Sequence, residues 1–255
     1  MVAPLRRAMP RMGGRKLYHL LRPFLAVSGV GRDRFFDILR ANHMLVMPKR
    51  SYHVTTNSRH MFRKYRNLVM QRVPTGPEQV WVADITYIGG RDRHAYLALV
   101  TDAYSKKIMG YDLSDSLGAS GAVRALRMAD RGRMYRGNTL IHHSDRGIQY
   151  CCDEYQLAAR RCRLTISMTE GYDPYANAVA ERVNGILKQE FALEDLDLPL
   201  AIQRKIVAES IEIYNTMRPH SSCSMLTPSQ MHLQSEVKIK TYRKNWRSQR
   251  ASPVK

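Results

Sequence analysis

Apolar and polar positions repeat with two different periods along the chain, and the change of period separates its beginning from its middle. Over residues 1–45, apolar side chains recur three or four positions apart, the spacing of helices with one buried face. Residues 15–21 predict one such helix, whose extension Pro23 limits because proline donates no backbone hydrogen bond. Residues 32–42 predict a second helix after a glycine-containing turn. Two short helices joined in this way are typical of a helix-turn-helix, although a plain helical hairpin has the same pattern.

A strand-rich pattern begins at residue 79. Three stretches of β-branched, aromatic and aliphatic residues follow one another at short intervals, over 80–88, 95–100 and 108–113. Because the gaps between them are short, they predict an antiparallel meander.

Helix and strand patterns alternate after the meander. They predict a helix over 120–133, a strand over 140–143, a helix over 153–163, a strand over 164–168, and two long helices over about 175–192 and 199–217. In the first of these helices we expect Val123, Leu126 and Met128 to be buried. Three strands followed by alternating helices and strands predict an α/β fold with a mixed five-stranded sheet flanked by helices.

Net charge is unevenly distributed along the chain. The 255 residues include 41 Lys and Arg against 22 Asp and Glu, a formal charge of +19. Residues 1–73 carry 16 basic and 2 acidic side chains, residues 236–255 carry 7 and 1, and the segment between them is almost neutral. Two basic arms favour a polyanionic partner, most simply nucleic acid, although basic surfaces also promote solubility alone. The longest apolar run has six residues, so we expect no membrane-spanning helix, which needs about 20.

These patterns divide the chain into four parts. We expect a small all-α helix-turn-helix region that binds DNA over 1–45, a basic linker over 46–78, an α/β core over 79–235 and a basic tail over 236–255. The four cysteines have no C-x-x-C spacing, so we expect reduced cytosolic thiols rather than a zinc site or a disulfide framework.

Three acidic residues stand where a charge needs a partner. Asp84 lies inside the most apolar strand pattern, and Asp145 follows the strand over 140–143 just before a glycine turn. Glu181 lies on a predicted helix among alanines and valines. If the three converge, their oxygen-only ligand set suits Mg²⁺ or Mn²⁺ rather than Zn²⁺. Two such ions can assist chemistry at one phosphodiester.

Each acid also has a simpler interpretation. Asp84 can face solvent at the end of its strand, and Asp145 can accept hydrogen bonds within its own turn. Glu181 can pair with Arg182 or Lys188 on the helix surface. Only the joint arrangement of the three acids favours catalysis.

The spacing around Glu181 is more specific. Between Asp145 and Glu181 lie 35 residues, and Lys188 follows Glu181 by seven, which is two helical turns. Asn177 and Asn184 fall on the same helix face. Such a face can hold a metal through the glutamate and phosphates through the other side chains, although a solvated polar face is the alternative.

Four short motifs carry a resemblance to a known family. They are Trp81-Val-Ala-Asp84-Ile-Thr86-Tyr87, His143-Ser-Asp145-Arg-Gly147-Ile-Gln149-Tyr150, Asn177-Ala-Val-Ala-Glu181-Arg-Val-Asn184-Gly-Ile-Leu-Lys188 and Tyr214-Asn215-Thr-Met-Arg218-Pro219-His220-Ser-Ser222. Together with the spacing of the acids, they resemble the DDE transposases and retroviral integrases. The resemblance is closest to the bacterial insertion-sequence-three family, in its second-reading-frame catalytic product, and covers roughly residues 10–235.

The resemblance implies a ribonuclease-H-like catalytic core behind a helix-turn-helix domain. It implies that Asp84, Asp145 and Glu181 bind two Mg²⁺ ions, for which Mn²⁺ can substitute. It implies metal-dependent cleavage of insertion-sequence ends, followed by transfer of the freed 3′-hydroxyl into target DNA. Lys188 is then expected to hold donor DNA, and Asn177 and Gln149 to support the site or touch DNA.

The resemblance also implies partners. We expect double-stranded DNA as terminal inverted repeats and as target, a homo-oligomer on that DNA, the product of the upstream reading frame, and a cytoplasmic, nucleoid-associated location in a bacterium. End recognition is expected from the basic helices, with Arg32, Arg34 and Arg40 as candidates. Two alternatives remain: a nuclease of the same fold without strand transfer, and a catalytically silent DNA-binding relative.

The sequence departs from the family pattern in two places. Ala176 stands where Asp is frequent before Asn177, and Cys223 stands where Leu is usual. Neither change touches the three acids. The zinc-binding domain of retroviral integrases is not recognisable in the sequence.

Overall fold

A mixed five-stranded sheet forms the centre of the protein, as the sequence predicts. The computed structural model describes residues 1–47, 64–70, 72–90, 94–169 and 178–239. Its sheet has the order β3-β2-β1-β4-β5, in which β1, β2 and β3 are antiparallel and β4 and β5 run parallel to β1. The strands are β1 Val80–Ile88, β2 Ala95–Asp102, β3 Ile108–Ser114, β4 Ile141–Ser144 and β5 Thr165–Met168.

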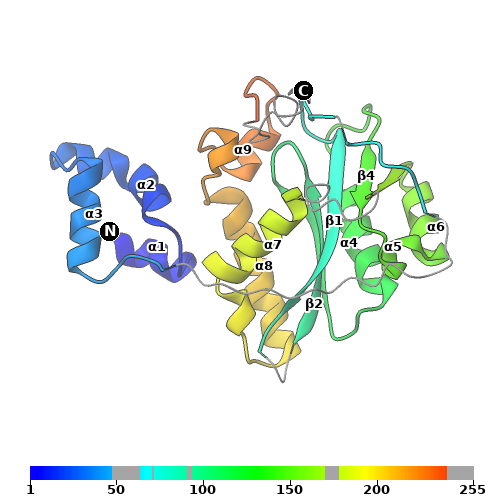
Figure 1. The fold of residues 1–255 in the computed structure, drawn as a ribbon, viewed down its shortest axis with the longest axis horizontal. Coiled ribbons are helices and arrows are strands. Elements are labelled where there is room, and N and C mark those ends of the chain that lie inside the picture. Colours follow the sequence, from blue (N-terminus) through cyan, green and yellow to red (C-terminus); the bar gives the residue numbers. More distant parts are fainter. Residues whose placement is uncertain (48–63, 71, 91–93, 170–177, 240–255) are drawn as a thin grey trace, which may run out of the picture.

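Helices cover both faces of the sheet (Figure 1). The helices are α1 Val2–Ala8, α2 Gly14–Val27, α3 Arg32–Ala41, α4 Ala119–Arg131, α5 Ile148–Cys151, α6 Asp153–Arg161, α7 Ala178–Glu190, α8 Leu200–Thr216 and α9 Pro228–His232, with short 3₁₀ turns at Leu193–Asp195 and Ser221–Cys223. Successive side chains of a strand point to opposite faces. In β1, Trp81 and Ala83 therefore pack on the side of α4 and α6, while Val80 and Val82 pack with Ala180 of α7. Because Asp84 has an even number too, it faces α7.

Close approach of helix to strand requires a glycine in β3. A Cβ on Gly110 would lie 2.6 Å from the backbone nitrogen of Ala129 and would also meet the carbonyl oxygen of Ala125. Both atoms belong to the backbone of α4. The absence of a side chain at Gly110 therefore lets α4 pack directly on the sheet.

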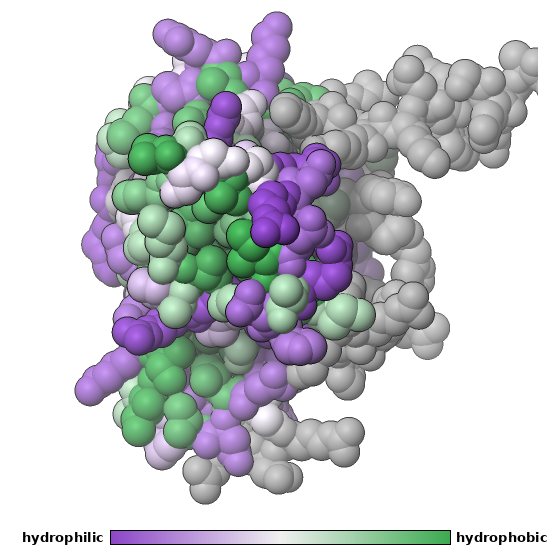
Figure 2. All heavy atoms as spheres, turned by 90° about the vertical axis from the view of Figure 1, so that its left-hand side faces the viewer, coloured by the Kyte–Doolittle hydropathy of each residue, from purple (hydrophilic) through white to green (hydrophobic). Residues whose placement is uncertain are grey.

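The three N-terminal helices form a small unit that packs on the end of α7. Leu17 and Leu21 of α2 and Phe35 and Leu39 of α3 are buried between them. Figure 1 shows this unit beside α7 and α8, on the side away from the sheet. Figure 2 looks at this end of the molecule and shows apolar surface among charged side chains. The helical pair expected over residues 15–42 is present.

The prediction that Pro23 limits the first helix is wrong. Pro23 lies inside α2, which continues to Val27. Proline at this position removes one backbone hydrogen bond, but the ring is exposed and the buried leucines lie on another part of the helix. Beyond the proline, Leu25 packs against the same apolar cluster as Leu17 and Leu21, so packing outweighs the local preference.

The expected burial of Met128 is also wrong. Val123 and Leu126 of α4 are buried as expected, whereas 36% of Met128 is exposed. Two residues correspond to about 200° around a helix, so Met128 lies nearly opposite Leu126. Ala129 takes the buried position instead.

Parts of the predicted linker and tail fall outside the described residues, namely 48–63, 71 and 240–255. Within the linker, the backbone nitrogen of Leu68 donates to Ser167 Oγ at 2.9 Å, and Tyr65 packs against the apolar cluster under α4 and α6. Residues 64–70 thus lie against the edge of the sheet at β5.

The four cysteines form no disulfide in the structure. Cys223 is fully buried beside Tyr104 and Met231, where a small apolar side chain fits. Among the described residues, the helices are too short or too polar to cross a membrane.

Candidate active site

The sheet brings Asp84 and Asp145 side by side. Strands β1 and β4 are parallel neighbours, with Val80 opposite Ile141 and Val82 opposite His143. Two residues further along each chain are Asp84, inside β1, and Asp145, directly after β4. Because paired strands lie about 4.8 Å apart, the two acids occupy neighbouring positions where the end of β4 lies beside the middle of β1.

Asp84 is held by two hydrogen bonds. Its Oδ1 accepts from the backbone nitrogen of Ile85 at 3.0 Å, and its Oδ2 accepts from Asn184 Nδ2 at 2.7 Å. Burial, the charge of Asp145 and the weaker effect of Glu181 raise the pKa of Asp84 to about 7. The three predicted acids therefore share one electrostatic environment. The solvent-facing interpretation of Asp84 does not apply, because the side chain is partly buried and faces α7.

Asp145 makes the turn contact that its sequence allows. Its Oδ1 accepts from the backbone nitrogen of Gly147 at 2.9 Å, and the Ser144 hydroxyl donates to the Asp145 carbonyl oxygen at 3.0 Å. These bonds fix the backbone that follows β4. A role in the turn and a role in a site are compatible, because an aspartate carries two oxygens with two lone pairs each.

Glu181 lies in the first turn of α7 and is the most open of the three acids. Partial burial of its carboxyl raises the pKa of Glu181. Within the described part of the chain it forms no ion pair with Arg182 or Lys188, so the surface-pair interpretation is not supported.

The carboxylate oxygens of the three acids are of a type that binds divalent cations, but the three side chains are not close enough together in this structure to bind one ion jointly. Hard carboxylate oxygens suit Mg²⁺ and Mn²⁺. The negative charges of the neighbouring acids repel that of Asp84 and raise its pKa. A bound cation would reduce this repulsion. However, no group of three His, Cys, Asp or Glu side chains among the residues that the structure describes is close enough to hold a metal ion.

Lys188 and Gln149 lie beside the acids. Burial lowers the pKa of Lys188, and the charges of Glu194 and Asp84 oppose that shift, so Lys188 lies within electrostatic range of Asp84. Gln149 uses its Nε2 to donate to the Leu117 carbonyl oxygen at 3.0 Å, which joins the start of α5 to the loop before α4. Asn177 lies outside the described residues.

The three candidate arginines lie away from this site, on the exposed surface of α3 (Figure 1). Arg32 pairs with Asp33 at 2.9 Å and Arg40 with Asp37 at 2.6 Å, both in exposed positions. Exposed pairs of this kind are weak, so both guanidinium groups are available to another anion.

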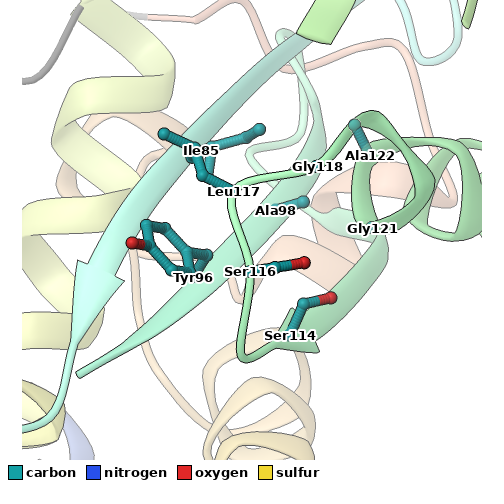
Figure 3. Close-up of a pocket in the computed structure, with 9 residues that line it drawn as sticks. All are labelled: Ile85, Tyr96, Ala98, Ser114, Ser116, Leu117, Gly118, Gly121 and Ala122. Carbon is teal, nitrogen blue, oxygen red and sulfur yellow. The ribbon is translucent and has the colours of Figure 1, made fainter. Parts of the chain in front are cut away.

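A small pocket lies beside Ile85 of β1 (Figure 3). Because successive side chains of a strand alternate, Ile85 points to the opposite face from Asp84. It is lined by Ile85, Tyr96, Ala98, Ser114, Ser116, Leu117, Gly118, Gly121 and Ala122. None of these side chains is charged or a common metal ligand, and the Ser114 hydroxyl already bonds Asp112 at 2.6 Å. The pocket therefore adds no chemistry to the acids.

The motif over residues 214–222 has a structural role. Tyr214 donates its hydroxyl to the Lys106 carbonyl oxygen at 2.9 Å, and the Asn215 amide exchanges two bonds of 3.0 Å with the backbone of Ile108. Arg218 makes two bonds of 2.8 Å to Glu190, the last residue of α7. The motif thus ties α8 to the sheet and to the helix that carries Glu181.

Comparison with known proteins places this arrangement in a family. Two family models, each described as an integrase core domain, match residues 74–174 and 162–228. The insertion element IS600 31 kDa protein of Shigella sonnei is 36% identical over 217 residues, which cover 82% of this chain and 78% of that protein. The chain belongs to the IS3 family of DDE transposases.

Other members of the IS3 family support the assignment. Transposase InsF of insertion sequence IS3A in Escherichia coli K12 is 38% identical over 157 residues, covering 61% of this chain. The chain spans about half of InsF, since the match covers 54% of it. A chain in the structure of a simian T-cell lymphotropic virus intasome with a PP2A regulatory subunit is 20% identical to this chain. It aligns with a TM-score of 0.55 over 91% of this chain and 79% of that one, which confirms the ribonuclease-H-like integrase fold.

The IS3-family assignment confirms the resemblance on which the sequence analysis relied. Its enzyme class is that of a DDE-type polynucleotidyl transferase. What sequence reasoning missed is the direct bond from Asn184 to Asp84, because these residues stand 100 positions apart. The shared helix face of Glu181, Asn184 and Lys188 was the only signal for it.

Proposed function

We propose that this transposase cleaves the ends of its insertion sequence and transfers the freed 3′-hydroxyl into target DNA at a centre formed by Asp84, Asp145 and Glu181. The observation that carries the proposal is the placement of Asp84 beside Asp145, with α7 bonded to Asp84 through Asn184. Glu181 precedes Asn184 by three residues, so the two lie on the same face of α7. Because Asn184 bonds Asp84, this is the face that α7 turns towards β1.

The three carboxylates would hold the divalent cations, two Mg²⁺ ions, with Mn²⁺ as a substitute. When bound, the ions lower the pKa of the attacking water or hydroxyl and neutralise charge on the phosphorus. The protein's part is to supply oxygen ligands from two rigid strands and one helix. Asp84 in β1 and Asp145 directly after β4 would supply metal ligands. Lys188 nearby would supply a positive charge for a DNA phosphate.

Two regions would share the binding of DNA. Lys188, Gln149 and Asn177 would hold the donor end beside the acids. Residues 1–45, as a helix-turn-helix region with Arg32, Arg34 and Arg40 on α3, would recognise the terminal inverted repeats. The strong positive charge of residues 1–73 supports this division, because DNA binding releases counterions from each neutralised phosphate.

The working assembly would be a homo-oligomer on paired ends in the bacterial nucleoid. The product of the upstream reading frame would join it as a fused or separate segment. The core over 79–235 would carry the chemistry, and the basic segments over 46–78 and 236–255 would follow the DNA backbone.

Substitution of the acids tests the proposal. Asp84→Asn, Asp145→Asn and Glu181→Gln should each reduce Mg²⁺-dependent cleavage of a labelled terminal-repeat duplex by at least about a hundredfold. Binding of the same duplex in a mobility-shift assay should stay within about twofold in each variant. Wild-type cleavage by any of the three variants would overturn the assignment of the centre.

A further inference from the structure

Asn184 makes an unusual contact for a buried asparagine. Its Nδ2 donates to Oδ2 of Asp84 at 2.7 Å, and only 5% of the residue is exposed. The bond links the middle of α7 to the middle of β1. It ends on the side chain of an acid, not on the backbone.

The direction of the amide group is fixed by its partner. In the structure the NH₂ group of Asn184 faces Asp84 and donates to its Oδ2, the arrangement that an ionised carboxylate, which only accepts hydrogen bonds, requires. This leaves the amide oxygen, Oδ1, on the other side of the group. Among the residues that the structure describes, this buried oxygen has no hydrogen-bond partner.

Asn215 shows what a purely structural asparagine looks like in the same protein. It is similarly buried, and both of its amide atoms are satisfied by the backbone of Ile108, at 3.0 Å each. Buried polar groups are normally paired in this way, and an unpaired one needs a specific explanation. Asn184 differs from Asn215 in that its donor ends on the side chain of an acid and its amide oxygen is unpaired.

The bond also leaves Asp84 able to act as a ligand. Each oxygen of Asp84 accepts one N–H, from Ile85 or from Asn184. An oxygen with two lone pairs keeps one of them after accepting one hydrogen bond. Two N–H donors therefore fix the plane of the carboxylate, and each carboxylate oxygen keeps one lone pair for a metal ion.

We propose that Asn184 is a positioning residue that fixes the Asp84 carboxylate for a divalent cation and holds α7, with Glu181, against β1. This inference rests on the proposed function. Side chains that hydrogen-bond to metal ligands orient those ligands, and their loss weakens metal binding about 10- to 100-fold. Asn184 acts through Asp84 and does not itself have to touch DNA.

Metal binding by the full chain without DNA tests this role apart from activity. Mn²⁺ is titrated into the protein and the free ion is measured by electron paramagnetic resonance, with an Asp84→Asn, Asp145→Asn double variant to subtract binding elsewhere. Asn184→Leu removes the donor and keeps the volume, and should raise the Mn²⁺ dissociation constant about 10- to 100-fold. Asn184→Ala removes the same donor without a branched side chain and should do the same if the leucine variant does not fold.

Asn215→Ala is the matched control. It removes an equally buried asparagine, so it should lower the melting temperature while leaving the Mn²⁺ dissociation constant within about twofold of wild type. Wild-type Mn²⁺ affinity in a folded Asn184 variant would overturn the inference and leave the proposed function standing. If wild type binds no more Mn²⁺ than the double variant, the proposed function and the inference both fail.

Discussion

Arg218 and Glu190 face each other across two hydrogen bonds of 2.8 Å, and Lys16 donates a third bond to the same carboxylate at 2.7 Å. Arg218 is 1% exposed, so the pairing with Glu190 compensates the cost of burying its charge. Glu190 ends α7, Arg218 follows α8, and Lys16 belongs to α2. One carboxylate therefore joins the helix that carries Glu181 to the last long helix and to the N-terminal unit.

The first prediction concerns pH. Burial alone would raise the pKa of Glu190, but Arg218 and Lys16 outweigh it and lower that pKa to about 2. A lowered carboxyl pKa stabilises the fold above the ordinary value near 4.5, and this stabilisation is lost as the pH falls towards 2. Glu190→Gln should therefore cost about 3 kcal/mol in urea unfolding at pH 7, and the gap to wild type should narrow between pH 5 and pH 3.

Glu209→Gln is the control for this series, because Glu209 is exposed on α8. It should change the free energy of unfolding by less than about 0.5 kcal/mol at every pH. A Glu190→Gln gap that stays constant from pH 5 to pH 3 would show that the charge of Glu190 is not what stabilises the junction.

The second prediction concerns the attachment of the N-terminal helices. Lys16→Met removes the side-chain bond from α2 to Glu190, a charge-assisted bond of about 1.5–3 kcal/mol. Hydrogen–deuterium exchange of α2 should become at least about tenfold faster. Arg15→Met, on the exposed neighbour, should leave the exchange unchanged. Equal exchange in the two variants would show that the Lys16–Glu190 bond does not hold the N-terminal helices in place.

The third prediction concerns the contact between β3 and α4. Gly110→Ala places a Cβ against the backbone of α4, so helix or strand must shift. We expect a loss of about 3 kcal/mol or more in urea unfolding. Gly137→Ala, where a Cβ would meet no atom within 4 Å, should be neutral within about 0.5 kcal/mol. Similar midpoints for both variants would refute the close packing at Gly110.

Local patterns predicted what depends on local residues. The β-branched and aromatic run of β1 was predicted at its observed bounds, Val80–Ile88, because seven of its nine residues favour a strand. The sequence suggested that Asp84 and Asp145 could converge, but only the order of the strands, in which β1 and β4 are neighbours, brings them together. The bond from Asn184 to Asp84 and the Glu190–Arg218 pair could not be predicted, since they join residues 100 and 28 positions apart and no local pattern indicates them. Pro23 shows the opposite error, where a strong local preference is overruled by packing.

The fourth prediction concerns DNA binding by α3. Replacing Arg32, Arg34 and Arg40 together by Ala should weaken binding of a terminal-repeat duplex and reduce its salt dependence. Each lost phosphate contact lowers the log–log slope by about 0.9, so the slope should fall by up to about 2.7. The control replaces three exposed arginines of α4 and α6, Arg131, Arg160 and Arg161, by Ala. An equal effect of both triple variants would move end recognition away from α3.

Strand transfer is the most direct test of the central claim. A labelled duplex that carries the terminal repeats flanking the gene is incubated with the protein, Mg²⁺ and a target plasmid, with and without the fused upstream-frame segment, beside a Glu181→Gln control. The account predicts nicked ends and a joined donor–target product that require intact Glu181. Joined product from the Glu181→Gln variant, or nicking that never yields joined product even with the upstream segment present, would contradict it.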